Sequence, residues 1–430
     1  MKRIVCTLLI LFLLPWSCLG EDTLSARDVF LLLEADETGQ VYALFGDAMR
    51  SVMSEADLAA VLPSLEAAVG ALQQMGMEET TVSDPYVICA LPLQYERQNL
   101  LFQVSWEKGR IAGMYFSILP GDAFLPASEP LPDGIVEEEI TVGDPPLSGL
   151  LTLPSHFVSP LPAVVLLHGS GPSDRDESVG GVKLFRDLAW GLAQHGIAVL
   201  RYDKRTLAYG NDYTPDEIRS MTVREEAMDD AALAARLLSA DPRIDPSRVY
   251  LIGHSLGASI APRIASEHPG LFAGLVLLSG TPVTLAEVAI HQQLAVSDGE
   301  GLEAALTEQW ENVLSSPAEE AIGLSLFGVP AYYFWDLGHY DIGETLAGLS
   351  LPALIINGGS DFQVTDRDGI DAWRALTLPD TVTLIHHPEL NHFLMAPGAP
   401  KDVSGTALEY EIPCHAPQKI IEEISAFILQ

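Results

Sequence analysis

The sequence predicts an α/β protein with a mostly parallel sheet, helices on both faces of that sheet, a helical cap and a small α+β domain in front. Three observations support this prediction. From residue 135 onward, short apolar runs of strand length alternate with helical patterns. Residues 283–350 interrupt that alternation with a stretch typical of helices and loops, as an insertion over the sheet would. The residues before 119 show helices followed by strands, and a chain of 430 residues has room for two domains.

The chain begins with the pattern of a secretory signal peptide, for which we expect the bounds 1–20. Two basic residues precede an apolar run over residues 4–14, which is shorter than the roughly 20 residues that span a bilayer. Cys18 and Gly20 are the small residues of a cleavage site, and we expect cleavage after Gly20. A lipoprotein anchor on Cys18 is the alternative, but the proline and tryptophan before it do not suit that motif. We therefore expect an exported protein, secreted or extracytoplasmic, without stable insertion in a membrane.

The next part of the chain predicts a small α+β domain over residues 21–118, whose role the sequence does not indicate. Helical periodicity covers residues 24–75. Three strand patterns follow from residue 86, and a turn at Lys108–Gly109 separates the last two. Residues 119–134 contain four prolines and two glycines, which exclude a helix or a central strand. That stretch predicts a linker between domains.

The parallel-sheet domain is expected over residues 135–430. Two strand patterns open it, at residues 135–142 and 147–154. Six apolar runs follow, at residues 163–168, 197–203, 248–253, 274–280, 352–358 and 381–387. Helical patterns between them include residues 182–195, 223–239 and 256–267. Because such continuous apolar strands are typical of sheets buried on both faces, they predict a parallel sheet between two helical layers.

The composition excludes several classes of function. The formal net charge is −36 and no basic run occurs, which argues against binding to nucleic acid or to anionic membranes. Beyond the signal peptide only Cys89 and Cys414 remain, without the spacing of a metal site. We interpret them as two separate thiols, with one bridge as the alternative. The sequence has no P-loop, no dinucleotide fingerprint and no metal-binding constellation, so no cofactor is expected.

A candidate nucleophile lies in the segment RVYLIGHSLGASIAPRIA, where Ser255 stands in a G-x-S-x-G pattern between a strand and a helix. That context is typical of a nucleophile elbow. Gly253 and Gly257 suit it because side chains at these positions would clash with the neighbouring strand and helix. The turn would place the hydroxyl at a helix N-terminus, where the helix dipole favours developing negative charge. The alternative is an inert serine in a glycine-rich turn.

A serine nucleophile needs a base, and the base needs an orienting acid. In folds of this kind the chain order is Ser, then Asp or Glu, then His. Asp361 follows the strand pattern at 352–358, at the edge of a parallel sheet where sites lie. His392 lies on the loop after the next strand, where it can reach Ser255. The sequence thus predicts a Ser255–His392–Asp361 triad.

Three other residues compete for the roles of acid and base. Asp366 is the second candidate acid, although we interpret it as the N-cap of the helix that follows. His386 and His387 lie within or at the end of the last strand, less free than His392 to move over the serine.

The oxyanion hole needs two backbone N–H donors. We expect one from Leu256, directly after the nucleophile, and the other from Ser170, in the segment HGSG after an earlier strand. The alternative for HGSG is a flexible turn. Residues 174–176 predict an ion-paired loop that supports this segment, and we expect His254 to pack rather than to react.

The domain from residue 135 onward resembles secreted bacterial carboxylesterases of the α/β-hydrolase superfamily, in the branch named serine-aminopeptidase-like or dienelactone-hydrolase-like. The resemblance rests on five segments, HGSGPSDRDES, RYDKRT, GHSLGASIAPRIA, GGSDFQVTDRD and PELNHFL. In those proteins a small domain of unknown function commonly precedes the hydrolase, and residues 24–118 look similar to it. The resemblance implies an α/β-hydrolase fold and activity on acyl esters, with Ser255, Asp361 and His392 as the triad.

Three hypotheses for function follow. The first is an exported hydrolase that cleaves carboxylic esters through an acyl-enzyme on Ser255, with a small-molecule ester as its partner. The second is an aminopeptidase-like or saccharide-deacylating hydrolase with the same triad. The third is a binding protein that keeps the fold without turnover, against which the complete Ser–Asp–His order argues. The sequence predicts neither the natural substrate nor the oligomeric state.

Overall fold

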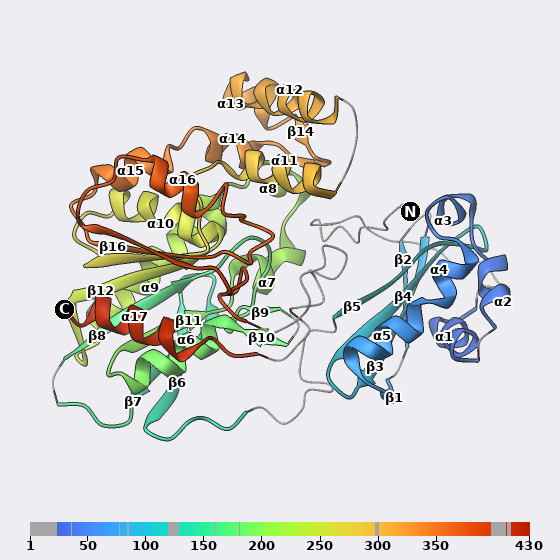
Figure 1. Ribbon diagram of the computed structural model, residues 1–430, viewed down its shortest axis with the longest axis horizontal. Coiled ribbons are helices and arrows are strands. Elements are labelled where there is room, and N and C mark those ends of the chain that lie inside the picture. The colour runs from blue at the N-terminus through green and yellow to red at the C-terminus, as the bar shows by residue number, and fades with distance from the viewer. Residues whose placement is uncertain are drawn as a thin grey trace. The chain divides into compact units, whose positions relative to one another are not determined.

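The structure is a computed structural model (Figure 1). It describes residues 24–35, 37–76, 78–83, 86–118, 129–158, 160–179, 181–296, 301–396, 410 and 414–430. The expected signal peptide lies outside these residues, as do residues 119–128 of the expected linker. The described residues divide into two compact units. The N-terminal unit runs to Pro130 and also includes Val179, Gly181 and Tyr410, and the main unit holds the other residues from Leu131 onward. Each unit is described by itself below.

The N-terminal unit has short helices followed by an antiparallel sheet. Its helices are α1 (Ala26–Glu34), α2 (Thr38–Ala43), α3 (Asp47–Val52), α4 (Glu55–Ala59) and α5 (Val61–Val69). Its strands are β1 (Leu72–Met75), β2 (Glu79–Ser83), β3 (Tyr86–Tyr95), β4 (Asn99–Glu107) and β5 (Arg110–Ile118). β3 pairs with β1, β2 and β4, and β4 pairs with β5, all antiparallel. The three strands expected from residue 86 are therefore present.

The predicted helical region 24–75 extends too far. Gly70 follows α5 with a φ of +83°, a left-handed conformation that ends the helix. Leu72–Met75 then pair with β3 as strand β1, because an available sheet edge outweighs a weak helical pattern. The unit has its own core, in which the rings of Phe30 and Phe102 lie 5.6 Å apart.

The main unit contains an eight-stranded sheet with the order β17-β16-β13-β12-β8-β11-β7-β6. The strands from β17 to β11 run parallel, and β7 and β6 are antiparallel to their neighbours. Their bounds are β6 (Ile135–Val142), β7 (Leu147–Pro154), β8 (Leu161–Leu167), β11 (Ala198–Tyr202), β12 (Ile244–His254), β13 (Gly274–Leu278), β16 (Ala353–Gly358) and β17 (Val382–His387). Each strand predicted from the sequence is present, so the predicted fold class is confirmed.

Helices cover both faces of this sheet, with α10 and α16 on one side and α6 and α17 on the other (Figure 1). The helices are α6 (Leu184–Gln194), α9 (Asp229–Ala240), α10 (Leu256–Glu267), α16 (Ile370–Ala375) and α17 (Gln418–Ile428). A π-helical turn, Arg224–Met228, leads into α9. Shorter elements connect these parts: β9 (Ser178–Val179), β10 (Val182–Lys183), α7 (Arg205–Tyr209), the 3-10 turn Gly210–Asp212 and α8 (Pro215–Ser220).

The interval 283–350 forms helices with a small core of their own, which includes Ile290, Trp310 and Phe334. The helices are α11 (Leu285–Val296), α12 (Leu302–Ser315), α13 (Ala318–Ala321), α14 (Tyr332–Gly338) and α15 (Ile342–Gly348). The sequence did not predict the short hairpin of β14 (Ser325–Leu326) and β15 (Val329–Pro330). Its turn residues Phe327 and Gly328 both have positive φ, which is what a two-residue hairpin loop requires.

Within the described residues, no helix is both long and apolar enough to cross a bilayer. Cys89 and Cys414 are both free thiols, as expected.

Candidate active site

Ser255 lies between β12 and α10 in a strained backbone conformation, with φ 53° and ψ −118°. A positive φ is uncommon for a residue other than glycine. The strain is held in place because the N–H of Ser255 donates to the carbonyl of Leu278 on β13, at 2.9 Å. Its side chain is half-buried. The structure thus presents this hydroxyl at the carboxyl end of a central strand, beside the first turn of a helix.

The glycines on either side of Ser255 are required by close contacts. A Cβ at Gly253 would lie 2.3 Å from the carbonyl oxygen of Gly257. A Cβ at Gly257 would lie 2.2 Å from the carbonyl oxygen of Leu167, at the end of β8. The clash expected from the sequence is therefore present at both positions.

Asp361 and His392 form a buried pair at the ends of two neighbouring strands, β16 and β17. His392 Nδ1 lies 2.7 Å from Asp361 Oδ2. The other carboxylate oxygen of Asp361 accepts hydrogen bonds from the N–H groups of Gln363, at 2.7 Å, and Val364, at 2.8 Å. The two residues are 5% and 2% exposed. These bonds fix the carboxylate, which in turn fixes the orientation of the imidazole.

The base candidate lies beside the residue that precedes the serine. The rings of His254 and His392 are 4.9 Å apart, and His254 Nε2 lies 2.9 Å from the carbonyl oxygen of His392. Neither Ser255 Oγ nor His392 Nε2 makes a hydrogen bond with another described residue. In serine hydrolases without substrate, the hydrogen bond between the serine hydroxyl and the histidine is often long, and it tightens when substrate binds.

The other candidates for acid and base, Asp366, His386 and His387, form hydrogen bonds away from Ser255. His386 Nε2 lies 2.9 Å from Asp366 Oδ1, and His387 Nε2 lies 2.9 Å from Glu423 Oε2 on α17. The interpretation of Asp366 as an N-cap is wrong, because α16 starts later and its N-cap is Gly369. The Asp366 carboxylate forms a hydrogen bond with the imidazole of His386 instead.

The loop after β8 carries the second expected oxyanion donor, Ser170. This loop packs directly on the serine, since a Cβ at Gly169 would lie 3.1 Å from Ser255 Cβ. The N–H of Ser170 donates to no other residue in the part of the chain that the structure describes. Leu256 is the first residue of α10, and N–H groups in the first turn of a helix have no intrahelical partner.

Two buried charged side chains that the sequence did not single out hold Gly169. Glu177 Oε1 accepts the N–H of Gly169 at 2.8 Å. Lys204 Nζ donates to the carbonyl of Gly169 at 2.8 Å and pairs with Glu226 at 2.7 Å. That carbonyl and the N–H of Ser170 belong to one planar peptide group and point in opposite directions. The bond from Lys204 therefore fixes the direction of the Ser170 N–H.

Glu177 also connects this loop to the elbow. Its Oε2 lies 3.1 Å from Nδ1 of His254, and both side chains are buried. A carbonyl can only accept a hydrogen bond, so Nε2 of His254 donates to His392, while Nδ1 faces the carboxylate. Nδ1 and Oε2 are at ion-pair distance without the geometry of a hydrogen bond, and the buried carboxylate favours an imidazolium over a neutral ring. His254 packs in the core, as half of a buried pair with Glu177.

The pKa shifts agree with this charge assignment. Burial alone would lower the pKa of His254, but the carboxylate of Glu177 outweighs it and the pKa is raised. Burial alone would raise the pKa of Glu177, but the charge of His254 outweighs it and the pKa is lowered. His168 is different: burial lowers its pKa to about 4, so it is neutral at neutral pH.

The loop over residues 174–176 is ion-paired, as expected. Arg175 pairs with Asp203 at 3.2 Å, and Asp176 pairs with the buried Arg201 at 3.0 Å.

Comparisons with known proteins agree with the fold. A family model described as "Alpha/beta hydrolase family" matches residues 164–405. The chain is 33% identical over 385 residues to esterase EstD of Thermotoga maritima, covering 89% of each chain. Residues 131–430 number only 300, so this match includes part of the N-terminal unit.

Two solved structures align with part of this chain at low identity. Est1E from Butyrivibrio proteoclasticus is 15% identical with a TM-score of 0.42, covering 68% of this chain and 97% of that one. A proline iminopeptidase from Mycobacterium smegmatis is 19% identical with a TM-score of 0.43, covering 68% and 98%.

Proposed function

Because the chain belongs to the α/β-hydrolase family and is an esterase-type hydrolase, we propose that it is an exported serine esterase that forms an acyl-enzyme on Ser255. In this proposal His392 is the base and Asp361 its orienting acid. The observation that carries it is the buried 2.7 Å contact between Asp361 and His392. The family implies a small-molecule ester as substrate.

The reaction begins when Ser255 Oγ attacks the carbonyl carbon of the ester. The Oγ–carbon bond forms, the Oγ proton passes to His392 Nε2, and the carbonyl electron pair moves onto oxygen. Asp361 stabilises the resulting imidazolium. The N–H groups of Leu256 and Ser170 would donate to the oxyanion, whose charge develops in the transition state and is complete in the tetrahedral intermediate.

The tetrahedral intermediate then collapses. The bond to the alcohol oxygen breaks, and that oxygen takes the proton from His392 as the alcohol leaves. Water repeats the sequence on the acyl-enzyme: it gives a proton to His392 and adds to the acyl carbon, and Ser255 leaves with the proton. Ester and water become acid and alcohol, and the enzyme returns to its starting state.

The decisive variant is Ser255→Ala. We expect kcat for a chromogenic short-acyl ester to fall by about 10⁴-fold or more, since the triad acts as a unit. Ser266→Ala, on the exposed side of the same helix, is the matched control and should keep full activity. An organophosphonate should label Ser255 in intact-protein mass spectrometry and should not label the variant. Retention of more than a few per cent of activity would remove Ser255 from the mechanism.

The same assays address the other parts of the proposal. An aminoacyl anilide, run in parallel with the ester, tests the peptidase alternative on the same triad. Export is supported by the pattern of residues 1–20 alone. If it occurs as proposed, the N-terminus of the mature protein is Glu21, which N-terminal sequencing measures.

A further inference from the structure

A chain of polar side chains connects the loop after β8 to the inserted helices of residues 283–350. Lys204, whose ammonium group donates to the carbonyl of Gly169, also pairs with Glu226 Oε1 at 2.7 Å. The other carboxylate oxygen of Glu226 accepts a hydrogen bond from the hydroxyl of Tyr333. Tyr333 lies on α14, within the insertion. These contacts therefore join the insertion to the peptide that the proposed oxyanion hole uses.

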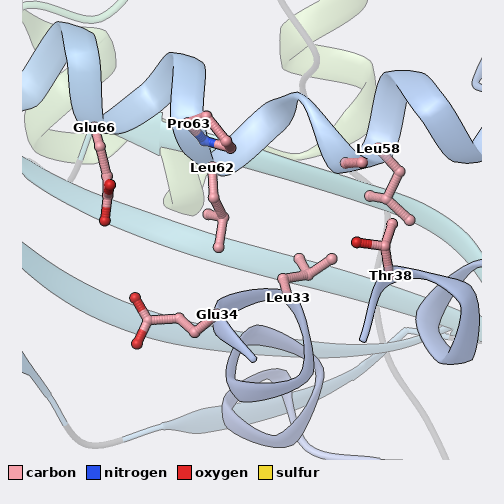
Figure 2. Close-up of a pocket in the computed structure, with 8 residues that line it drawn as sticks. Leu33, Glu34, Thr38, Leu58, Leu62, Pro63 and Glu66 are labelled. Atoms are coloured by element: carbon pink, nitrogen blue, oxygen red, sulfur yellow. The ribbon is translucent and has the colours of Figure 1, made fainter. Parts of the chain in front are cut away.

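Glu226 is a buried carboxylate in an uncommon turn. It is 6% exposed and lies in the π-helical turn Arg224–Met228. Such turns are rare and occur frequently at functional sites. Glu34 and Glu66, which line a pocket of about 230 Å³ in the N-terminal unit, are by contrast exposed, so that water screens their charges (Figure 2). The buried carboxylate is screened much less, so its orientation depends on the two side chains that bond to it.

The helix that carries Tyr333 is fixed on the main unit. Tyr333 and Leu337, one helical turn apart, pack in the core around the large sheet, while Phe334 belongs to the core of the insertion. Asp336 on the same helix accepts two hydrogen bonds from Arg263 of α10, at 2.7 and 3.0 Å. The hydroxyl of Tyr333 therefore has a defined position relative to the helix that follows the candidate nucleophile.

This hydroxyl determines how the carboxylate of Glu226 meets Lys204. Because Tyr333 takes one carboxylate oxygen, the ammonium group pairs with the other one. Without the hydroxyl, the first oxygen would be a buried acceptor without a partner, which is costly. We then expect the carboxylate to turn both oxygens toward Lys204 and to draw the ammonium group away from the carbonyl of Gly169. Burial and the charge of Glu226 hold the pKa of Tyr333 well above its ordinary value, so the phenol keeps the proton that it donates.

We propose that Tyr333 is a positioning residue for the oxyanion hole. Through Glu226 and Lys204, its hydroxyl fixes the direction of the proposed donor, the N–H of Ser170. The oxyanion hole is then complete only when the inserted helices are in place. This inference rests on the proposed function, because it assigns Tyr333 to the same ester hydrolysis.

Tyr333→Phe removes the hydroxyl and keeps the ring. We expect kcat for a short-acyl ester to fall by about 3- to 10-fold and KM to stay within about twofold, because the oxyanion develops only in the transition state. Tyr332→Phe, whose ring stacks on Trp335 in the same helix, is the matched control and should keep full activity. Circular dichroism checks that each variant is folded.

A trifluoromethyl ketone gives a second measurement of the oxyanion hole. Ser255 Oγ adds to its carbonyl carbon, the carbonyl electron pair moves onto oxygen, and the resulting oxyanion resembles that of the tetrahedral intermediate. Its inhibition constant should rise in Tyr333→Phe by the same factor by which kcat falls, because both depend on the same donors. In Tyr332→Phe the inhibition constant should not change.

A double variant tests whether the effect passes through Lys204. In a Lys204→Met background, Tyr333→Phe should lower kcat by less than about 1.5-fold, because the connection is already broken. Equal losses with and without Lys204 would overturn the inference. An unchanged kcat in the single variant or a parallel rise in KM would do the same. So would an equal loss of kcat in Asp336→Asn, which weakens the attachment of α14 to α10 without touching Glu226.

Ser255→Ala, measured in the same assay, separates this inference from the proposed function. An inactive Ser255→Ala variant beside an unaffected Tyr333→Phe variant contradicts the inference alone. Turnover by Ser255→Ala contradicts the proposed function and, with it, the oxyanion hole that Tyr333 would position.

Discussion

Ser255 keeps a backbone conformation that costs on the order of 1–3 kcal/mol for a residue with a Cβ. The structure holds it there through the bond from its N–H to Leu278 and the close approach of Gly253 and Gly257. Such strain persists only where the surroundings over-determine it, and it collects at functional sites. At the residue scale, this strained serine and the fixed Asp361–His392 pair are the features on which the proposed mechanism rests.

The two candidate acids give a direct test of the assignment. We expect Asp361→Asn to lower kcat by about 10⁴-fold, because the histidine loses the partner that fixes its tautomer and stabilises its charge. Asp366→Asn should change kcat by less than about threefold, since that side chain is 45% exposed and bonds to His386 rather than to the base. Ester hydrolysis under saturating substrate measures both. An inactive Asp366 variant beside an active Asp361 variant would reverse the assignment of the acid.

At the scale of elements, the peptide Gly169–Ser170 is held on the elbow by charged side chains from two directions. Lys204 binds its carbonyl, and Glu177 binds the N–H of Gly169 and pairs with His254. These contacts join the loop after β8 to the turn between β12 and α10. In the proposed mechanism Lys204 and Glu177 are positioning residues, because they bond to Gly169, next to the proposed donor Ser170, and not to the substrate.

Removal of one of these contacts should affect the chemical step and not substrate binding. Lys204→Met should lower kcat by roughly 10- to 100-fold, less than loss of a donor itself, and leave KM within about twofold. Lys183→Met, which breaks a partly buried ion pair with Asp176 that does not contact Gly169, is the control. A parallel rise in KM, or equal losses in both variants, would indicate a general loss of structure rather than a misdirected Ser170 N–H.

The ion pair of Glu177 and His254 should make stability depend on pH. The pKa of His254 is raised by folding. Its contribution to the free energy of unfolding is therefore full below the ordinary pKa of 6.5 and is lost as pH rises through the raised pKa. The pKa of Glu177 is lowered, so its contribution is full above 4.5 and is lost as pH falls through the lowered value. Both contributions are full between these two pH values.

Urea titrations at a series of pH values measure this. The free energy of unfolding of the unchanged protein should contain a decline above about pH 6.5 that Glu177→Gln lacks, because burial alone lowers the pKa of His254. Identical slopes above that pH in the two proteins would show that the pair is not charged.

The elements show what can be read from a sequence and what cannot. β6 and β7 have the bounds predicted from the sequence, residues 135–142 and 147–154. Leu72–Met75 were misjudged because their partner strand, β3, lies further along the chain. Glu177 and Lys204 belong to segments the sequence analysis quoted, yet nothing local distinguishes them from the surface charges beside them. Only the tertiary contacts with Gly169 do so.

At the scale of the whole molecule, the two units have separate hydrophobic cores. We therefore expect a fragment that starts near Asp133 to fold and to hydrolyse a short-acyl ester with about the same kcat as the full chain. The measurement is kcat of the purified fragment, with circular dichroism as the test of folding. Aggregation of the fragment, with recovery when residues 21–118 are added, would mean that the cores depend on each other.

The position of β17 has a consequence for the order in which the protein is synthesised and becomes active. It is the last strand of the sheet in chain order and lies at the sheet's edge, and its side chains are less buried than those of its neighbour β16. His392 follows it, more than a hundred residues after Ser255. A ribosome therefore completes the elbow and most of the sheet well before it supplies His392, the proposed base. Edge strands are also among the first parts to fray. Turnover would then be the last property that the nascent chain gains and the first that a partly melted molecule gives up.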